Sequence, residues 1–288
     1  MATGTRTPPA PEPGTTADPE ADHRRQAALA RNGRTVAMVW RRELIRLRRT
    51  PTRIVTGLAQ PVIFLFIMGA GLGRLIQSGR ADGFDYQEFL FPGILAMSVI
   101  TSSLFSAVSV VWDREFGFMR EMLVAPVSRA SIVVGKALGG GSVSVVQGLI
   151  LIVAAPVVGV SLTAPRFLGL VVSLLLLAYA LTAFGMVLAT RMERMESFQM
   201  VMTLVMQPMI FLSGAVFPLQ ELPTWLAVLT RLNPATYGVD MVRRTVLPDS
   251  PGVTVGGEVV PLWAEGLLVV GLGTALLAVA VRLFHRTE

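Results

Sequence analysis

The chain has 288 residues, of which 52% are hydrophobic and only 15% are charged, and its formal net charge is +6. Because a soluble domain has about 25% charged residues, this chain has too few polar side chains to cover a surface in water, and lipid is the expected solvent. Nucleic-acid binding is not indicated, since the basic residues border apolar stretches without an interleaved aromatic pattern. The absence of cysteine excludes disulfides, thiolate metal sites and cysteine nucleophiles.

The N-terminal region divides into two parts. Residues 1–33 are rich in Pro, Ala, Thr and Gly without an apolar run, which predicts a disordered tail and gives no signal-peptide core. Residues 34–50 are predicted to form an amphipathic helix, with Val36, Trp40 and Leu44 on one face and arginines on the other. Such a helix suits the headgroup region of an anionic leaflet, and the alternative is the solvated face of a soluble helix.

Six apolar stretches are long enough to cross a bilayer, which takes about 20 residues. Only the last has charges near its ends, at Glu265 and Arg282, and no interior contains Asp, Glu, Lys, Arg or His. The stretches are residues 54–72, 89–111, 137–160, 167–189, 198–216 and 262–284. They predict an all-α integral membrane protein in which residues 51–288 form a six-helix transmembrane domain.

The distribution of basic residues predicts the orientation. With the N-terminus inside the cell, 19 of the 25 Lys and Arg residues fall in cytoplasmic segments and six fall outside. Cytoplasmic loops carry the excess of positive charge in membrane proteins. Both termini are therefore expected in the cytoplasm.

The loop between the second and third spans, residues 113–136, contains a predicted amphipathic helix. Phe116, Met119 and Leu123 share one face, and Pro126 ends the run. The helix either rests on the membrane or docks into a soluble partner. The Gly-rich stretch that begins at Gly135 is interpreted as close helix packing by small residues.

The outer loop after the fifth span, residues 217–261, is also too regular to be a simple connector. Apolar residues recur at helical spacing from Leu222 to Leu232, Asn233-Pro234 breaks that helix, and a second short helix follows to about Val246. These helices lie on the outer interface or re-enter the protein, where neighbouring protein satisfies the backbone. The Gly- and Val-rich stretch beyond them predicts a turn or small hairpin.

Catalytic motifs are missing from the sequence. It contains neither a G-x-x-x-x-G-K-[ST] phosphate loop nor an H-E-x-x-H zinc motif, and its only histidines, His23 and His285, lie outside the spans. An ion-driven carrier or a channel is disfavoured because the span interiors lack charged residues for a coupling ion. An intramembrane enzyme is disfavoured because paired carboxylates or histidines are absent at membrane depth.

Two groups of motifs resemble a known family. The first comprises F-L-S-G-A-V-F-P at residues 211–218, L-P-T-W at 222–225, L-N-P-A-T-Y at 232–237 and the pair Arg243-Arg244. The second runs from R-E-F-G at 114–117 to M-L-V-A-P-V-S-R at 122–129. In this order and spacing they are similar to the membrane-spanning subunits of ABC-2-type exporters, most closely antibiotic-resistance permeases of the daunorubicin-exporter kind.

The resemblance implies a multi-pass half-transporter of the bacterial plasma membrane that exports a hydrophobic or amphiphilic compound. A second permease copy and two copies of a separate ABC ATPase are the implied partners, besides membrane lipid, and nucleic acid is not expected. ATP and Mg would bind the ATPase, so no cofactor, metal or catalytic residue is expected in this chain. Export of a glycan or a lipid-linked polymer is the alternative.

The resemblance and the residue patterns together predict three sets of site residues. The set that couples to the ATPase is Arg114, Glu115, Phe116, Gly117, Met119, Arg120, Glu121, Leu123, Pro126 and Arg129, with Phe116, Met119 and Leu123 on the buried face. The extracellular gate is Phe211, Ser213, Gly214, Pro218, Leu222, Pro223, Trp225, Asn233, Pro234 and Tyr237. The substrate path is Met202, Met206, Gln207 and Met209, where flexible thioethers suit a promiscuous apolar surface; ordinary packing or lipid contact is the alternative for these residues.

Overall fold

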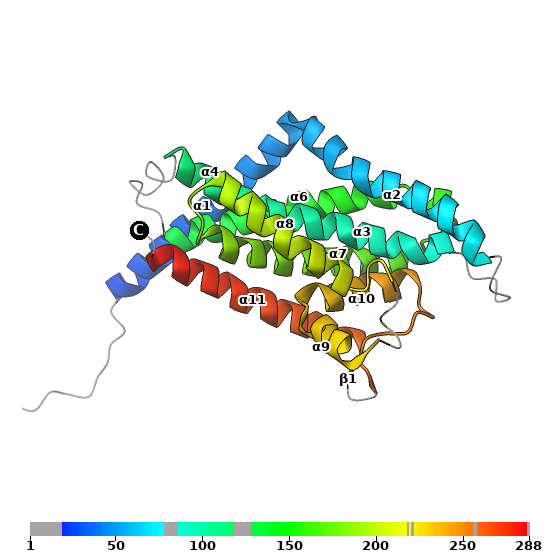
Figure 1. Cartoon of the computed structure of the whole chain (residues 1–288). Coiled ribbons are helices and arrows are strands. Elements are labelled where there is room, and N and C mark those ends of the chain that lie inside the picture. The colour runs from blue at the N-terminus through cyan, green and yellow to red at the C-terminus, as the bar shows by residue number, and fades with distance from the viewer. Residues whose placement is uncertain are drawn as a thin grey trace, which may run out of the picture.

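A computed structural model describes residues 19–77, 86–117, 128–217, 219, 222–255 and 258–286. This part of the chain is mostly helical with one small antiparallel hairpin, and most of its long helices run side by side (Figure 1). The elements are α1 (Pro19–Arg49), α2 (Pro51–Gln77), α3 (Tyr86–Ser106), α4 (Val108–Glu115), α6 (Arg129–Ile152), the 3-10 helix η1 (Ala155–Val158), α7 (Ala164–Ala189), α8 (Met195–Leu212), α9 (Thr224–Leu232), α10 (Pro234–Val246), β1 (Thr254–Val255), β2 (Glu258–Val259) and α11 (Leu262–Arg286).

The membrane-spanning character of the chain is visible in these helices. Among the described residues, five stretches are long and apolar enough to cross a bilayer, and α3 with α4 forms one of them. A sixth span results if residues 31–49 and 54–67, which meet at an angle of 69°, count as one broken span. The predicted class, a mostly helical membrane protein with several spans, is therefore confirmed.

Two predicted boundaries are corrected. Helix α1 begins at Pro19, inside the stretch 1–33 for which composition predicts disorder. The third span was expected to continue to residue 160, but α6 ends at Ile152 and gives way to η1. Pro156 explains this end, because proline has no backbone N–H for a continuing helix, and Gly159 then turns the chain with a φ of 84°.

Helix α3 lies at the centre of the bundle. Leu90, Ile94, Val99 and Leu104 are buried along its length, and it packs against α2, α6, α7 and α10. By contrast, α8 and α11 bury only 22% of their most apolar stretches. One flank of each of these two helices therefore faces outward from this chain, as a lipid-contacting or subunit-contacting helix does.

Close packing by small residues joins α6 to its neighbours, as the Gly-rich stretch predicts. A Cβ atom added to Gly135 would lie 2.8 Å from the Cβ of Val39, and one added to Gly139 would lie 2.7 Å from the Cβ of Glu43. Both partners belong to α1, and the Trp40 indole donates a hydrogen bond to the Ser142 hydroxyl at 3.0 Å. Helix α1 is thus docked against α6, while its place in the headgroup region stays a prediction.

Two glycine substitutions test this packing. We expect Gly93→Ala to reduce the amount of folded protein sharply, because the added methyl group would overlap the carbonyl oxygen of Ala215, a backbone atom that cannot rotate away. Gly271→Ala in α11 is the matched control, since nothing lies within 4 Å of its added Cβ and alanine is favoured over glycine in a helix by about 1 kcal/mol. Thermal unfolding in detergent should show a lower Tm for the first variant only; equal Tm values would contradict the close approach of α3 to residue 215.

Candidate functional site

Two side chains at the end of α4 form hydrogen bonds with the backbone between α7 and α8. Arg114 donates from Nη1 to the carbonyl oxygens of Thr190 (3.0 Å) and Met192 (3.2 Å), which follow the end of α7. Glu115 accepts a hydrogen bond from the backbone N–H of Met195, the first residue of α8, at 3.0 Å. The charges match the helix dipoles, with a cation at the C-terminus of α7 and an anion at the N-terminus of α8.

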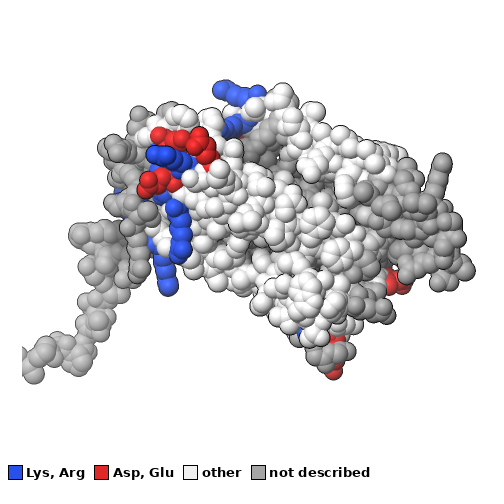
Figure 2. Space-filling model, in the orientation of Figure 1, with Lys and Arg blue, Asp and Glu red and all other residues white. Residues whose placement is uncertain are grey.

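A buried ion pair ties the same end of α4 to α6. The Lys136 ammonium, which is 1% exposed, donates to the Asp113 carboxylate and, at 2.9 Å, to the carbonyl oxygen of Ser109. Arg42 of α1 lies 3.9 Å from the other oxygen of Asp113. Together with Arg114 and Glu115, Asp113 and Lys136 form what we call the charged-end junction. On the face drawn in Figure 2, most charged side chains gather at this end of the molecule.

The charged-end junction anchors both sides of the predicted coupling segment. Residues 118–127, which include Met119, Arg120, Glu121, Leu123 and Pro126, lie outside the described residues. On one side α4 ends at Glu115 and Gly117 turns with a φ of 78°; on the other, the Ser128 hydroxyl caps α6 by accepting from Ser131 N–H at 3.2 Å. The two helices that flank this segment in the sequence are therefore fixed to each other by the Asp113–Lys136 pair.

The residues predicted to couple to a partner divide in role. Arg114 and Glu115 hold the chain's own backbone, so their charges have internal partners rather than serving only an external surface. Phe116, predicted on the buried face of the coupling helix, directly follows the end of α4; on this chain it is 59% exposed and its ring lies 5.1 Å from that of Trp112. Its burial against a partner stays a prediction. Arg129 is the half-buried first residue of α6.

The opposite end of the bundle, which we call the hairpin end, is built around the C-terminus of α8. The Asn233 side chain donates to the carbonyl oxygen of Met209 at 2.7 Å and also caps α10 by accepting from Ala235 N–H. The Thr236 hydroxyl lies 3.2 Å from the Leu212 carbonyl oxygen and 2.7 Å from that of Thr230. These contacts satisfy carbonyl groups that a helix end leaves without partners.

Arg243 completes the bonding of this turn. Its guanidinium donates to the carbonyl oxygens of Gly214 (2.6 Å) and Ala215 (3.3 Å) and lies 3.9 Å from the centre of the Phe89 ring in α3. Burial lowers the pKa of Arg243 to about 10, partly offset by Asp240, so the side chain is still a cation near neutral pH. This buried cation of α10 therefore links α10 to the Phe89 ring of α3 and to the turn that follows α8.

The predicted gate residues fall into two groups. Ser213, Gly214, Asn233 and Tyr237 are buried. Ser213 and Gly214 form the turn after α8, where Gly214 has a φ of 78°, Asn233 precedes α10, and Tyr237 in α10 donates to the Arg231 carbonyl oxygen at 2.9 Å. The others lie nearer the surface or outside the described part: Phe211, Pro223 and Trp225 are exposed, Leu222 and Pro234 are half-buried, and Pro218 is not among the described residues.

The predicted substrate-path residues also separate. Met202 and Met209 are buried in the core, which favours the packing alternative for them, whereas Met206 is half-buried and Gln207 is exposed. The exposed flank of α8 is instead formed by Met200, Leu204 and Phe211. On α2 there is a shallow apolar groove of about 450 Å³, lined by Thr56, Ala59, Gln60, Ile63, Phe64 and Ile67.

Several buried charges were not predicted as site residues. Asp113 and Lys136 meet only through the fold, since they lie on different helices and no sequence spacing links them. Asp240 and Arg244 stand four residues apart on α10, and this helical spacing was the signal that could have found them. Glu265 was noted only as a charge near a span end, yet it is fully buried beside Arg244. Among the described residues, no group of three or more His, Cys, Asp or Glu side chains is placed to hold a metal ion.

Long apolar helices that are linked to one another by polar contacts at both ends define a multi-pass membrane protein. Residues 34–247 match the model of the ABC-2 type transporter family. The chain is 34% identical over 255 residues to nodulation protein J of Rhizobium meliloti, covering 87% of this chain and 95% of that protein. It is 33% identical to the transport permease ycf38 of Cyanophora paradoxa, covering 70% and 71%. The chain belongs to the ABC-2 type transporter family, as its motifs predict, and membership implies an ABC ATPase partner.

The buried ion pair of the charged-end junction should be essential for stability. Lys136→Met leaves the buried Asp113 carboxylate without its ammonium partner, and breaking such a pair costs about 3 to 5 kcal/mol. Thermal unfolding in detergent should show a large fall in Tm, partly restored in Asp113→Asn/Lys136→Met. Arg282→Met removes the same charge from an exposed position in α11 and should leave Tm nearly unchanged. A Lys136→Met protein as stable as that control would show that the pair contributes nothing.

The two functions of Asn233 can be separated by substitution. Asn233→Ser keeps an oxygen that can cap α10 but is too short to reach the Met209 carbonyl oxygen, whereas Asn233→Ala loses both contacts. Loss of a cap alone costs about 1 kcal/mol. The Tm in detergent should therefore fall in the order wild type, Ser, Ala. Identical Tm values for the two variants would argue against the capping role.

Proposed function

We propose that this chain is the membrane-spanning half of an ATP-driven exporter and works as a pair of identical copies with two copies of a separate ABC ATPase. The charged end faces the cytoplasm, with both termini on that side, and the hairpin end faces outward. The cargo is a hydrophobic or amphiphilic compound that leaves between the two copies. The observation that carries the proposal is the fixing of α4 to α6 and α8 on either side of residues 118–127 in the sequence.

The charged-end junction supports coupling to an ATPase. A partner that pushes on residues 118–127 acts directly on α4, and Arg114 and Glu115 connect α4 to the start of α8. The Asp113–Lys136 pair passes the same displacement to α6. Rigid helices and ion pairs of this kind are the physical means by which a displacement reaches a distant site. Differential affinity of the ATPase for two permease states would then shift their populations.

The exposed apolar flanks support the pairing and the cargo class. The exposed side chains of α8 and the groove on α2 offer apolar surface that a second copy would cover. The residues that line this groove, and Gln207 on α8, are uncharged. Such a surface suits an apolar or amphiphilic molecule better than an ion.

Affinity purification from the native membrane in mild detergent tests the partnership. We expect a P-loop ATPase to co-purify in roughly one-to-one ratio with the permease, and permease copies carrying two different tags to purify together. A permease that emerges alone, even after mild cross-linking, would contradict the proposal.

Phe116 offers a surface test of the coupling. Phe116→Ala should weaken ATPase binding by about 2 kcal/mol, roughly 30-fold in Kd, if this exposed ring is an anchor of the interface. Phe167→Ala is the matched control, since Phe167 is an exposed phenylalanine at the other end of the bundle, in the first turn of α7. Both proteins should insert and unfold like wild type. Unchanged ATPase binding by the Phe116 variant would remove this residue from the interface.

The cargo class is tested with a fluorescent amphiphile. Inside-out vesicles that contain the permease and its co-purified ATPase should accumulate daunorubicin when ATP is added, and the accumulation should stop when ATP is replaced by a non-hydrolysable analogue. ATP hydrolysis without any accumulation of daunorubicin would argue against this cargo class and would direct the search to glycans and lipid-linked polymers.

A further inference from the structure

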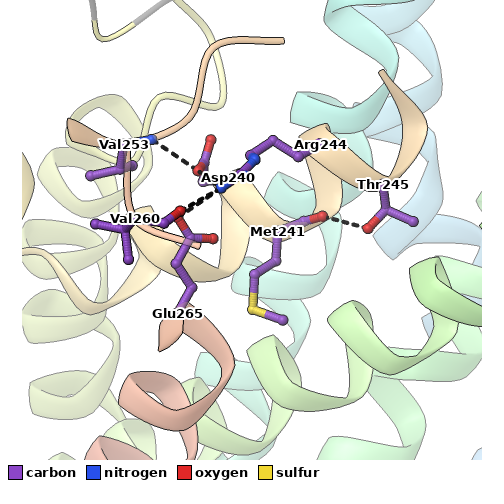
Figure 3. A network of polar contacts seen from close by, with 7 residues as sticks. All are labelled: Asp240, Met241, Arg244, Thr245, Val253, Val260 and Glu265. Carbon is purple, nitrogen blue, oxygen red and sulfur yellow. Dashed lines mark hydrogen bonds and ion pairs between the residues drawn. The ribbon is translucent and has the colours of Figure 1, made fainter. Parts of the chain in front are cut away.

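A network of charges at the hairpin end joins three elements that neither motif group links (Figure 3). Arg244, in the last turn of α10, lies 3.7 Å from Asp240 on the same helix and 3.5 Å from Glu265 on α11. Its guanidinium also donates to the Val260 carbonyl oxygen at 2.7 Å, just after strand β2. Asp240 accepts from Val253 N–H at 3.0 Å, just before strand β1. One arginine therefore contacts α10, the hairpin and α11.

Arg244 is the central residue of this network. The carboxyl groups of Asp240 and Glu265 both face its one guanidinium, and Glu265 is fully buried. The helix end adds to this, because a cation is favoured at the C-terminus of α10. Removing Arg244 would leave the two carboxyl groups without the guanidinium that they share and would release the Val260 carbonyl oxygen.

Helix α10 is also docked on its other faces. A Cβ atom added to Gly238 would lie 2.6 Å from Leu177 of α7, and the hydroxyls of Thr245 and Ser173 are 3.4 Å apart. All residues from Ala235 to Arg243 are buried. With the bonds of Asn233 and Thr236 to α8, the helix is held by every neighbour that the structure describes around it.

Helix α9 is different. Within its nine residues only Thr230 is buried, and Trp225, Val228 and Leu232 are exposed. Its bonds to α10 lie near its C-terminal end, where the carbonyl oxygens of Thr230 and Arg231 accept from Thr236 and Tyr237. The N-terminal part of α9 can therefore swing about that end without breaking a buried contact.

We propose that Arg244 is the positioning residue that latches α10, the hairpin and α11 into one fixed unit, and that α9 alone moves when the hairpin end opens. The inference rests on the proposed exporter function and divides the predicted gate in two. Asn233 and Tyr237 belong to the fixed unit, and Trp225 belongs to the moving helix.

A disulfide lock tests whether α10 stays docked. The chain has no cysteine, so Gly169→Cys/Thr245→Cys introduces the only pair. A Cβ at residue 169 lies 3.1 Å from the Thr245 Cγ2 atom, which suits a disulfide between α7 and α10. Oxidised protein, with its co-purified ATPase in vesicles, should export daunorubicin at the wild-type rate, as should the reduced protein and each single variant. Loss of export on oxidation that reverses with a reductant would overturn the inference, because α10 would then have to move.

Reporter dyes follow the movement without any cargo. A dye on Val228→Cys of α9 should change its fluorescence when ATP is added to the complex, while a dye on Thr254→Cys of the hairpin should not. A hairpin response as large as that of α9 would overturn the inference. If the wild-type complex hydrolyses ATP without exporting daunorubicin, the proposed cargo class fails, and these reporters still decide where the hairpin end moves.

The role of Arg244 is tested by removal and rescue. Arg244→Ala should expose the backbone beside Val253, so that a membrane-impermeant maleimide labels Val253→Cys about tenfold faster, and export should fall by a similar factor. Arg166→Ala, an exposed arginine near the start of α7, is the control and should change neither rate. The oxidised 169–245 disulfide should restore export in the Arg244→Ala protein, because it replaces the lost hold on α10. If the disulfide forms but export stays low, Arg244 acts on something other than the position of α10, and the latch is wrong. Should Arg244→Ala alone fail to fold, Arg244→Ala/Glu265→Gln removes the unpaired carboxyl group and carries the same rescue test.

Discussion

The hydrocarbon core of a bilayer cannot accept or donate hydrogen bonds. A helix end that reaches this depth must therefore find partners for its backbone inside the protein. The structure meets this constraint most clearly at the two ends of α8. At one end Glu115 accepts a hydrogen bond from the Met195 N–H, and at the other Asn233 and Thr236 donate to carbonyl oxygens of the last turn. These side chains belong to α4, to α10 and to the residue that caps α10. The same hydrogen bonds that satisfy the ends of α8 therefore also hold these two short helices in place.

This arrangement gives α8 an unusual position. It takes part in the junctions at both ends of the bundle, yet its flank between them is exposed. A displacement of α4 at the charged end therefore has a continuous physical route to the hairpin end through one helix. Pro208 lies in that helix, where the missing N–H weakens the backbone ladder and favours bending. The exposed flank of α8 leaves room for such bending.

The features that depend on local pattern could be predicted from the sequence. Apolar runs predict the spans, and the glycines around Gly135 predict close packing between helices, because both features follow from composition over a few turns. Pro156 also indicates that α6 ends before it, which the expected end at residue 160 did not take into account. The Asp113–Lys136 and Arg244–Glu265 pairs could not be predicted, since nothing in sequence spacing says which helices become neighbours. The exposed position of Phe116 likewise depended on where α4 stops.

The buried charges also sharpen the argument about the energy source. The span interiors contain no Asp, Glu, Lys, Arg or His, yet the structure buries Lys136, Arg243 and Glu265, which lie near span ends or in the outer loop. Each of these has a partner that fixes it: a carboxylate, two carbonyl oxygens and a guanidinium, respectively. A coupling-ion site needs a charge that is exchanged with solvent during transport, but these groups join helices to one another. They therefore act as fixed links between the helices of the bundle, which agrees with the proposal that the energy for transport comes from a separate ATPase.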